Sequence, residues 1–406
     1  MKILFVVPYV PNLVRVRPYN MIRALSQRGH QVTVLTVQAN EAEQADVAHL
    51  RQFCHEVRVA HMPLSRSLLN CTLALAGQEP LQSVFSWQPS LVQNSNHWER
   101  FDVIHVEHLR GARYGLYFKQ NSPVPVVWDS VDCISHLFRQ AAVESKDLLG
   151  RLRSRFDLPR TERYEGYLIQ QFDQVLVTSP GDRDELAALS ANGHAPIAVV
   201  PNGVDMAYFA PDTAVGRDPA TLIVSGKMSY HANVSMVVHL YQNIMPLIWQ
   251  RRPDVQLQIV GKDPTRDIQA MAQHPNVTVT GTVPHLPPYL QRATLAVAPI
   301  TYKAGIQNKI LEAMACATPV VTTTPAIAAL DLQPGKDVVV ADSPEMFAAS
   351  VLSLLEDTSR RQRIGQAGYE FVARRHSWAG VAEKLERVYQ EVARHREQPL
   401  SQALSI

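Results

Sequence analysis

The stretch from Ala296 to Thr323 reads AVAPITYKAGIQNKILEAMACATPVVTT and places a helical segment between two apolar ones. Ala296–Ile300 predicts a buried strand, Ile310–Ala317 predicts a helix, and Val320–Thr323 predicts the next strand. Two strands joined by a helix form a βαβ unit, whose strands are parallel and covered on both faces. The stretch therefore predicts an α/β fold.

The same alternation continues outward from this unit. Further apolar runs predict strands at Thr221–Ser225, Val255–Val260, Val277–Thr280 and Val338–Ala341, and a helix over Val234–Trp249. Residues 344 to about 396 predict helices. The first 200 residues predict a helix from Pro18 to Arg28 and strands at Ile3–Val7, Gln31–Val37, Val57–His61, Val103–Val106, Val124–Trp128 and Val175–Thr178. Strands alternating with helices predict two doubly wound, Rossmann-like domains.

The helix from Pro18 has chemistry suited to both of its ends. Pro18 suits the first helical position, and Gly29 suits the stop after the last one.

The linker between the domains is expected at Met206–Pro219, where prolines and Gly216 interrupt the periodicity. We expect an N-terminal domain at 1–205, a C-terminal domain at 206–376, and a C-terminal helix at 377–406 that packs back on the first domain. Ligands of such sheets bind at the carboxyl ends of the strands, so one site in a cleft between the domains is expected.

Composition excludes several classes of protein. The 406 residues include 39 Lys and Arg and 37 Asp and Glu, a net charge of +2, which argues against a dedicated nucleic-acid binder. Four cysteines without CxxC spacing predict neither a disulfide framework nor a cysteine zinc site, so a reducing, cytoplasmic location is expected. No run of 18 apolar residues predicts a membrane-spanning helix.

The segment from Gly305 to Glu312 has the residue types of a phosphate and ribose site. Gly305 has no Cβ and can approach a ligand closely, and the helix that follows would present free N–H groups to a phosphate. Lys309 adds a positive charge, and the Glu312 carboxylate could accept hydrogen bonds from a ribose diol. The alternative is an ordinary helix start with Glu312 in solvent, because a lone glycine before a helix is a weak signal.

The sequence from Glu312 to Val321, EAMACATPVV, resembles the donor-binding signature of the retaining GT-B glycosyltransferases of family four. VPNGVD at Val200–Asp205 resembles the hinge of that family, and LQIVG at Leu257–Gly261 and Val279–Gly281 resemble its strands. Asp102–His105 is similar to an N-domain strand that ends in histidine. The sequence at Gly305–Lys309 is similar to that of a subset of this family that is linked to bacterial exopolysaccharide synthesis.

This resemblance implies a GT-B fold, a nucleotide diphosphate sugar as donor, and no metal or other cofactor. It implies that Lys227, which follows Gly226 and fills the position of the family's arginine, stabilises the charge of the leaving diphosphate. Ala232 or its neighbours stand where the family has a lysine, so Lys309 is the candidate for the second charge. The implied donor-binding residues are Gly226, Lys227, Gly305, Ile306, Gln307, Asn308, Lys309 and Glu312. One departure is Ala304, which stands where the family has a glutamate that holds the donor sugar, so we expect weaker selection of the sugar. The family's Gly-Gly loop is also absent, and Asn12–Arg17 stands in its place.

Candidate residues of the N-terminal domain follow its predicted strands. His105 is expected to line the cleft, and Asp129 is expected to orient an acceptor or sugar hydroxyl, which makes both candidate catalytic residues. The alternative for Asp129 and Asp132 is capping of the helix that begins near Ile134. His105 and His108 are three residues apart on an extended strand, which argues against a metal site. The residues assigned to the acceptor side are Arg15, Arg17, His108 and Asp132.

The segment from Arg151 to Arg163 is rich in arginine. Related enzymes sometimes bind anionic membranes through a basic helix in the N-domain, so peripheral contact with the inner face of a membrane is one interpretation. The acidic residues Asp147, Asp157, Glu162 and Glu165 are interspersed, which favours a solvated helix face instead.

The sequence therefore predicts a metal-independent, retaining glycosyltransferase that moves a sugar to a hydroxyl of a glycan, a lipid-linked glycan or a small molecule. A nucleotide-sugar 2-epimerase or a phosphorylase is the alternative among enzymes, because both share the fold. A non-catalytic protein that binds a sugar nucleotide is the alternative outside enzymes, and Ala304 motivates it.

Overall fold

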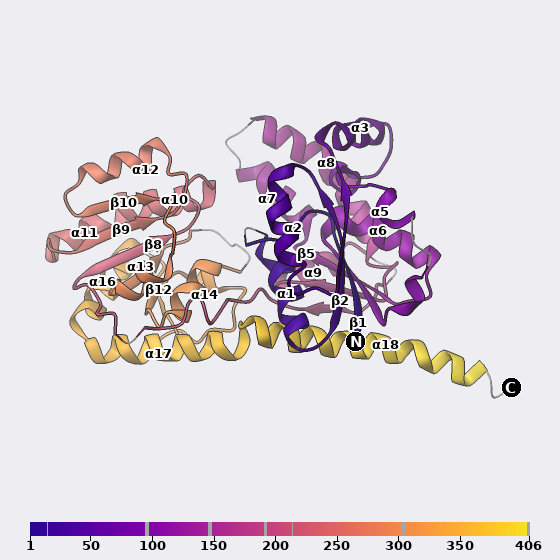
Figure 1. Ribbon diagram of the computed structural model, residues 1–406. Helices are drawn as coiled ribbons and strands as arrows, with labels where there is room; N and C mark the ends of the chain where they lie inside the picture. The colour runs from indigo at the N-terminus through magenta and orange to yellow at the C-terminus, as the bar shows by residue number, and fades with distance from the viewer. Residues whose placement is uncertain are drawn as a thin grey trace. The chain divides into compact units, whose positions relative to one another are not determined.

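The computed structural model describes residues 1–13, 15–93, 97–144, 148–190, 193–212, 214–301 and 306–403. The chain forms two compact units (Figure 1). Unit 1 comprises residues 1–201 and 381–406, and unit 2 comprises residues 202–380. No described helix is both long and apolar enough to cross a membrane.

Unit 1 is built on a parallel sheet of seven strands in the order β3-β2-β1-β4-β5-β6-β7. The strands are β1 (Lys2–Val7), β2 (Gln31–Gln38), β3 (Glu56–His61), β4 (Val103–Glu107), β5 (Val126–Val131), β6 (Gln174–Val177) and β7 (Ile197–Val199). Six of them match predicted strands, and the short edge strand β7 was not predicted. Nearly every residue of β1, β4, β5 and β6 is buried, as expected of parallel strands covered on both faces.

The helices of unit 1 connect these strands along the chain. They are α1 (Val16–Gln27), α2 (Gln44–Leu50), α3 (Leu64–Ala74), α4 (Leu81–Phe85), α5 (Ser90–Gln93), α6 (His108–Asn121), α7 (Ile134–Glu144), α8 (Leu148–Leu168) and α9 (Pro180–Ala187), with 3₁₀ turns η1 (Glu41–Glu43) and η2 (Trp98–Arg100). The last helix, α18 (Trp378–Ala403), contributes its residues from Val381 onward to unit 1. Pro18 is the third residue of α1 and not the first, a position where its missing N–H still costs no intrahelical hydrogen bond.

Unit 2 is built on a second parallel sheet, of six strands in the order β10-β9-β8-β11-β12-β13. The strands are β8 (Thr221–Ser225), β9 (Gln256–Val260), β10 (Val277–Gly281), β11 (Leu295–Ala298), β12 (Val320–Thr322) and β13 (Val339–Val340). The helices are α10 (His231–His239), α11 (Met245–Arg251), α12 (Arg266–Ala270), α13 (Pro287–Arg292), α14 (Asn308–Ala315), α15 (Thr324–Ile327), α16 (Pro344–Glu356) and α17 (Thr358–Arg375), with the 3₁₀ turn η4 (Met271–Gln273). The two Rossmann-like sheets confirm the predicted fold class.

The predicted helix Val234–Trp249 is interrupted in the structure. A π-helical segment, η3 (Leu240–Ile244), separates α10 from α11, and Pro246 is the second residue of α11. Proline has no N–H to donate and its ring crowds the preceding turn, so a wider turn before it relieves that clash. The hydrophobic period was read correctly, but the effect of this proline was missed.

The two sheets share one topology, which determines where a ligand site can form. In unit 1 the strand order reverses between β1 and β4, and in unit 2 it reverses between β8 and β11. At such a switch point the connecting helices leave toward opposite faces of the sheet, which opens a crevice at the carboxyl ends of the two strands. Each unit therefore has its own edge at which a ligand site can form.

Candidate functional site

The carboxyl end of β8 in unit 2 carries Gly226 and Lys227. Gly226 has φ +147° and Gly261, after the neighbouring strand β9, has φ +151°. A Cβ added to Gly261 would lie only 1.7 Å from the Gly226 carbonyl oxygen, so the two turns can approach each other only because that position is glycine. The turn leaves the Lys227 side chain exposed, while its carbonyl accepts a hydrogen bond of 3.0 Å from the Asn233 amide.

The carboxyl side of the neighbouring strand β11 leads into α14, which begins at Asn308, two residues before the predicted Ile310. Lys309 in its first turn donates a hydrogen bond of 2.9 Å to the Gln307 side chain, and desolvation lowers the pKa of Lys309 to about 8. Glu312 is half-buried one turn later, and desolvation raises its pKa to about 7. The carboxyl oxygen and the ammonium thus lie in surroundings less polar than water, where a charged ligand would interact with them more strongly.

Asn308 adds an unsatisfied polar atom to the same helix start. Its side-chain carbonyl oxygen is buried and has no hydrogen-bond partner among the described residues. A buried acceptor without a donor is costly, and such atoms in a native structure call for an explanation, of which an absent ligand is one. Ile306 is half-buried against the core of unit 2. Ala304 and Gly305 lie outside the described residues.

Unit 2 also contains a cavity of about 360 Å³ beyond the carboxyl ends of β11, β12 and β13. Its lining includes Thr301, Thr323 and Asp342, but none of the predicted donor-binding residues. The prediction that Lys227, Lys309 and Glu312 bind a donor therefore does not rest on this cavity.

The corresponding edge of unit 1 contains a buried ion pair between Arg17 of α1 and Asp129 of β5. The Arg17 Nε and Nη2 atoms donate hydrogen bonds of 2.9 and 3.1 Å to the two oxygens of the Asp129 carboxylate. Arg17 is 4% exposed and Asp129 is fully buried. Two parallel hydrogen bonds fix the relative orientation of guanidinium and carboxylate. Asp129 is thus already held by an arginine that the sequence had assigned to the acceptor side.

His105 on β4 is part of the same buried group. Its ring stacks on Phe5 with 4.1 Å between centroids, and its Nδ1 forms a hydrogen bond of 2.8 Å with the hydroxyl of Tyr389 in α18. Its Nε2 lies 3.6 Å from Asp129 Oδ2. Burial lowers the pKa of His105 to about 4, so the ring is neutral at pH 7. The structure places His105 in the interior of unit 1, whereas the sequence predicted a position at the surface of a cleft.

The sequence reasoning missed Glu107, the last residue of β4. Glu107 pairs with Asp129 across the β4–β5 ladder and is buried. Burial, followed by the charge of Asp129, raises the pKa of Glu107 to about 8, and the Tyr9 hydroxyl forms a hydrogen bond with its carboxyl group. Glu107 is thus a candidate proton carrier at this edge. Its position two residues after His105, on the same face of the strand, could have identified it.

Backbone strain is also found at this edge. His108 has φ +65° and Val131 has φ +70°. Positive φ is strongly disfavoured for a β-branched residue such as valine, and strained residues of this kind cluster at functional sites. They follow β4 and end β5, the two strands that carry Glu107 and Asp129. The strain independently marks the switch-point side of the sheet in unit 1.

The other residues assigned to the acceptor side have partners within unit 1. Arg15 forms an ion pair of 3.2 Å with Glu43, and its guanidinium lies over the Tyr9 ring. Burial lowers the pKa of His108 to about 4. Asp132 accepts a hydrogen bond of 3.3 Å from Thr178, and burial raises its pKa to about 6.

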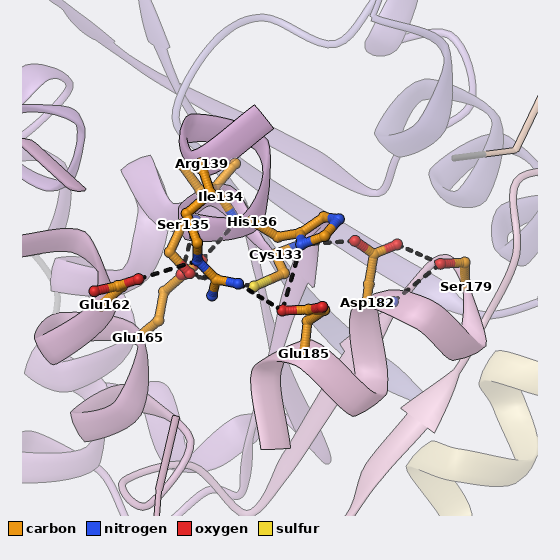
Figure 2. A network of polar contacts seen from close by, with 10 residues as sticks. All are labelled: Cys133, Ile134, Ser135, His136, Arg139, Glu162, Glu165, Ser179, Asp182 and Glu185. Carbon is orange, nitrogen blue, oxygen red and sulfur yellow. Dashed lines mark hydrogen bonds and ion pairs between the residues drawn. The ribbon is translucent and has the colours of Figure 1, made fainter. Parts of the chain in front are cut away.

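Neither Asp129 nor Asp132 caps α7, so the capping alternative is wrong. Glu165 of α8 does so, and accepts hydrogen bonds of 2.8 Å from the Ile134 amide and 3.0 Å from the Ser135 amide (Figure 2). Asp182 of α9 accepts from the Cys133 amide at 3.1 Å. Carboxylates from two other helices thus satisfy the N–H groups at this helix start, a capping mode that sequence spacing does not reveal.

Figure 2 also shows Arg139 of α7 between two carboxylates, Glu162 of α8 at 3.1 Å and Glu185 of α9 at 2.8 Å. These ion pairs join the helices on one side of unit 1. Asp157 and Glu165 are buried, so the prediction of a solvated helix face is wrong for these two acids. The side chains of residues 140–155, including the first three arginines of the basic segment, lie outside the description.

The described residues contain no group of three or more His, Cys, Asp or Glu side chains that could hold a metal ion.

Two family models match the chain. The model described as "Glycosyl transferase 4-like domain" matches residues 14–203, and that described as "Glycosyl transferases group 1" matches residues 219–357. The first match covers most of unit 1 without α18, and the second covers the sheet of unit 2.

Curated relatives carry the same kind of name. The chain is 29% identical over 247 residues to the glycogen synthase of Mycobacterium tuberculosis, an alignment that spans 58% of each protein. It is 24% identical over 407 residues to the D-inositol 3-phosphate glycosyltransferase of Corynebacterium diphtheriae, covering 92% of this chain and 88% of that one.

Solved structures share the fold. HepE of Anabaena in complex with UDP-glucose matches with a TM-score of 0.65 and 16% identity, over 96% of this chain and 100% of that one. At this level of identity the likeness concerns the fold alone.

Proposed function

We infer that this chain, which belongs to the group 1, family-four-like glycosyltransferases of GT-B fold, transfers a sugar from a nucleoside diphosphate sugar to a hydroxyl acceptor. The observation that carries this proposal is the arrangement at the switch point of unit 2. Lys227 follows β8, and Lys309 and Glu312 follow the adjacent strand β11. Two cations suit the diphosphate of such a donor, and a carboxylate suits its ribose.

Each residue has a distinct role in this proposal. Glu312 accepts hydrogen bonds from the ribose hydroxyls. Lys227 and Lys309 stabilise the negative charge that grows on the diphosphate as the bond from its oxygen to the anomeric carbon breaks. The N–H groups at the start of α14 and the unsatisfied side chain of Asn308 add uncharged contacts. All of these groups act by position and charge, so the reaction we propose requires no metal ion.

The acceptor is assigned to unit 1. We propose that the acceptor hydroxyl attacks the anomeric carbon from the side that the diphosphate leaves, so that the sugar retains its configuration. The proton of the hydroxyl passes to the departing phosphate oxygen. The Arg17–Asp129 pair keeps the edge of the sheet rigid, and the buried Glu107, whose raised pKa leaves it largely protonated at pH 7, adds little negative charge beside Asp129.

Similar proteins support the choice of donor. The HepE structure contains UDP-glucose, and the relatives named above are a glycogen synthase and an inositol phosphate glycosyltransferase. We propose a nucleotide sugar as the donor on this ground together with the site. The four cysteines are unpaired thiols, which supports a reducing compartment such as the cytoplasm as the place of the reaction.

A panel of nucleoside diphosphate sugars tests the proposal. A ligand present at about 100 times its dissociation constant stabilises a protein by about 2.7 kcal/mol, so a true donor should raise the thermal unfolding temperature. The donor found in this way is then incubated with candidate hydroxyl acceptors, and the anomeric configuration of the product is read by NMR. A product of inverted configuration would contradict the retaining mechanism.

The same incubation separates the alternatives. A 2-epimerase would convert the donor sugar without any acceptor, and a non-catalytic binding protein would stabilise but never consume it. Ala304 adds one expectation, that donors differing only in the epimer of the sugar are discriminated weakly. A preference above about 10⁴-fold, the size seen where a site hydrogen-bonds the distinguishing group, would contradict it.

A further inference from the structure

The cavity of about 360 Å³ in unit 2 has no part in the proposed reaction. It lies beyond the carboxyl ends of β11, β12 and β13, and residues of α10, η3 and α16 complete its lining. Sheets of this kind bind their ligands at the carboxyl ends of strands, and ligand sites have volumes of about 300–1,000 Å³. The cavity therefore has the position and the volume of a site for one small molecule.

The π-helical segment η3 shapes one wall of this cavity. His239, which directly precedes η3, and Ile244, its last residue, both line the cavity. Five residues of an α-helix turn through about 500°, which would place these two side chains on different sides of the helix. The wider turn of a π-helix, with hydrogen bonds between residues five apart, brings them back to one side, and such segments are frequent at functional sites.

The hydroxyl groups of two threonines in the lining are fixed by hydrogen bonds and can still accept another. The Thr323 hydroxyl donates to the Ile300 carbonyl, and the Thr324 hydroxyl donates to the Asp342 carboxylate at 2.8 Å. A hydroxyl oxygen has two lone pairs, which these bonds leave free. Both threonines thus present oriented acceptors to the cavity.

The lining also contains groups that can donate. Ser343 caps α16 by accepting a hydrogen bond of 3.2 Å from the Met346 amide, and its own hydroxyl proton stays available. The side chains of Thr301 and His239 form no hydrogen bond with a described residue. A ligand with several hydroxyl groups, each both donor and acceptor, would match this set.

The charge of the lining selects against ions. Asp342 is the only carboxylate among the described lining residues, and none of them is Lys or Arg. Its two oxygens already accept hydrogen bonds of 2.7 and 2.8 Å from the Thr324 amide and hydroxyl. A carboxylate without a cation repels a phosphate. Ile244, Ile300 and Phe347 add apolar surface, which suits the C–H groups of an uncharged ligand.

We propose that this cavity binds one uncharged sugar ring, either as a free monosaccharide or as the end of a glycan. The sugar hydroxyls pair with the threonine and serine hydroxyls and with His239, and the C–H groups of the ring face the apolar residues. The cavity contains none of the predicted donor-binding residues, so this is a second saccharide site that does not depend on the proposed reaction.

Calorimetric titration and saturation-transfer NMR of the full chain with glucose, galactose, mannose and N-acetylglucosamine test the proposal. At least one of these sugars should bind with a Kd of about 1 mM, the strength expected of a ligand of this size. The Kd should not change when UDP is present. A disaccharide of the bound sugar that binds more tightly identifies a glycan end as the occupant, and one that binds more weakly identifies the free sugar.

The H239A/T301A variant should bind the sugar about 30-fold more weakly, because two hydrogen-bonding groups are lost. Thr301→Ala alone changes an exposed side chain, so it should fold like wild type and bind about fivefold more weakly. The matched control is H285A/T282A, which removes an exposed histidine and an exposed threonine of unit 2 outside the cavity and should bind like wild type.

Three results would overturn the proposal. The first is a wild-type protein that binds none of the four sugars at ten times the expected Kd. The second is a sugar that UDP displaces, because it then occupies the donor site. The third is a folded H239A/T301A protein, checked by thermal unfolding, that binds the sugar as tightly as wild type.

Discussion

The two units carry the same strand order, yet the edges where the order reverses differ in kind. In unit 1 the polar groups are buried and most of them pair with one another, Arg17 with Asp129 and His105 Nδ1 with Tyr389, while His105 Nε2 and one Glu107 carboxyl oxygen have no hydrogen-bond partner among the described residues. In unit 2 Lys227 is exposed, Glu312 is half-buried, and an oxygen of Asn308 has no partner among the described residues. Topology thus provides a place for a ligand, while the partners of the side chains decide how each place is used.

Substitutions in the buried Arg17–Asp129 pair of unit 1 and at the exposed Lys227 of unit 2 should also differ in their effect on the free energy of unfolding. Removing one partner of a buried ion pair leaves an uncompensated charge in the interior, which is costly for the fold. Removing an exposed lysine changes the fold little, because water solvates its surroundings in any case. Substitutions in unit 1 should therefore act first on stability, and those in unit 2 on ligand binding and turnover.

The largest effect is expected for Asp129→Ala. Leaving the Arg17 guanidinium buried without its carboxylate should lower the free energy of unfolding by about 3–5 kcal/mol. Urea unfolding of the variant and of wild type measures this difference. The double variant R17M/D129L replaces both charges by apolar groups and should recover most of the loss. An Asp129→Ala variant as stable as wild type would show that the pair does not hold this edge together.

The next effect concerns turnover, through Lys227→Ala and Lys309→Ala in unit 2. Each variant should lose about 100-fold in kcat, by analogy with the loss of one donor to a developing negative charge. The unfolding temperature of Lys227→Ala should stay that of wild type, because the side chain is exposed. Lys336→Ala, another exposed lysine of unit 2, serves as the control. Full turnover in both single variants would remove these lysines from the site.

A smaller effect is expected for Tyr389→Phe. This change removes the hydrogen bond to His105 Nδ1 and leaves a buried nitrogen unpaired, at a cost of about 1–2 kcal/mol. If the bond orients His105 toward Asp129, kcat should fall about fivefold to tenfold while the affinity for the donor is unchanged. Calorimetric titration of the donor and steady-state kinetics separate the two quantities. An altered donor affinity would assign α18 to the donor side instead.

The smallest effect is the pH dependence of donor affinity. Lys309, with a pKa of about 8, loses its positive charge as the pH rises through that value, so its attraction to the diphosphate weakens. Glu312, with a pKa of about 7, loses its negative charge as the pH falls through that value, and with it the better acceptor for the ribose. Donor affinity measured from pH 6 to 9 should therefore be highest between about 7 and 8. In Glu312→Gln the decrease of donor affinity at low pH should disappear, while the decrease at high pH should remain. A donor affinity that changes at neither end of the pH range in wild type would contradict both assignments.

Much of the fold could be predicted because hydrophobic runs and helical spacing are local properties. The strand Thr221–Ser225 was predicted at its observed bounds, and the helix after Gln307 within two residues of them. The edge strand β7 was missed because its apolar run, Ile197–Val200 between Pro196 and Pro201, is very short. The π-helical segment before Pro246 was missed because the hydrophobic period continues through it.

The partners of side chains were far less predictable. Arg17 and Asp129 are 112 residues apart, and Tyr389 and His105 are 284 apart, so nothing in the local sequence links them. The cap of α7 comes from Glu165, on the following helix, and an acid 31 residues away is invisible to any spacing rule for caps. The candidate residues of unit 2 could be predicted from the sequence because the signature that contains Glu312 is one continuous stretch.

The central claim is that the β8–β11 edge of unit 2 binds a nucleoside diphosphate, and calorimetric titration of Glu312→Ala tests it most directly. Wild type should bind the nucleoside diphosphate of its donor, and Glu312→Ala should bind it at least about tenfold more weakly, the loss of one or two hydrogen bonds to a charged group. Its unfolding temperature should not fall, because the carboxyl group is held at an unfavourable pKa in the fold. Glu345→Ala, in the first turn of α16, is the control and should bind like wild type. A Glu312→Ala protein that is folded and binds the nucleotide as tightly as wild type would contradict the claim.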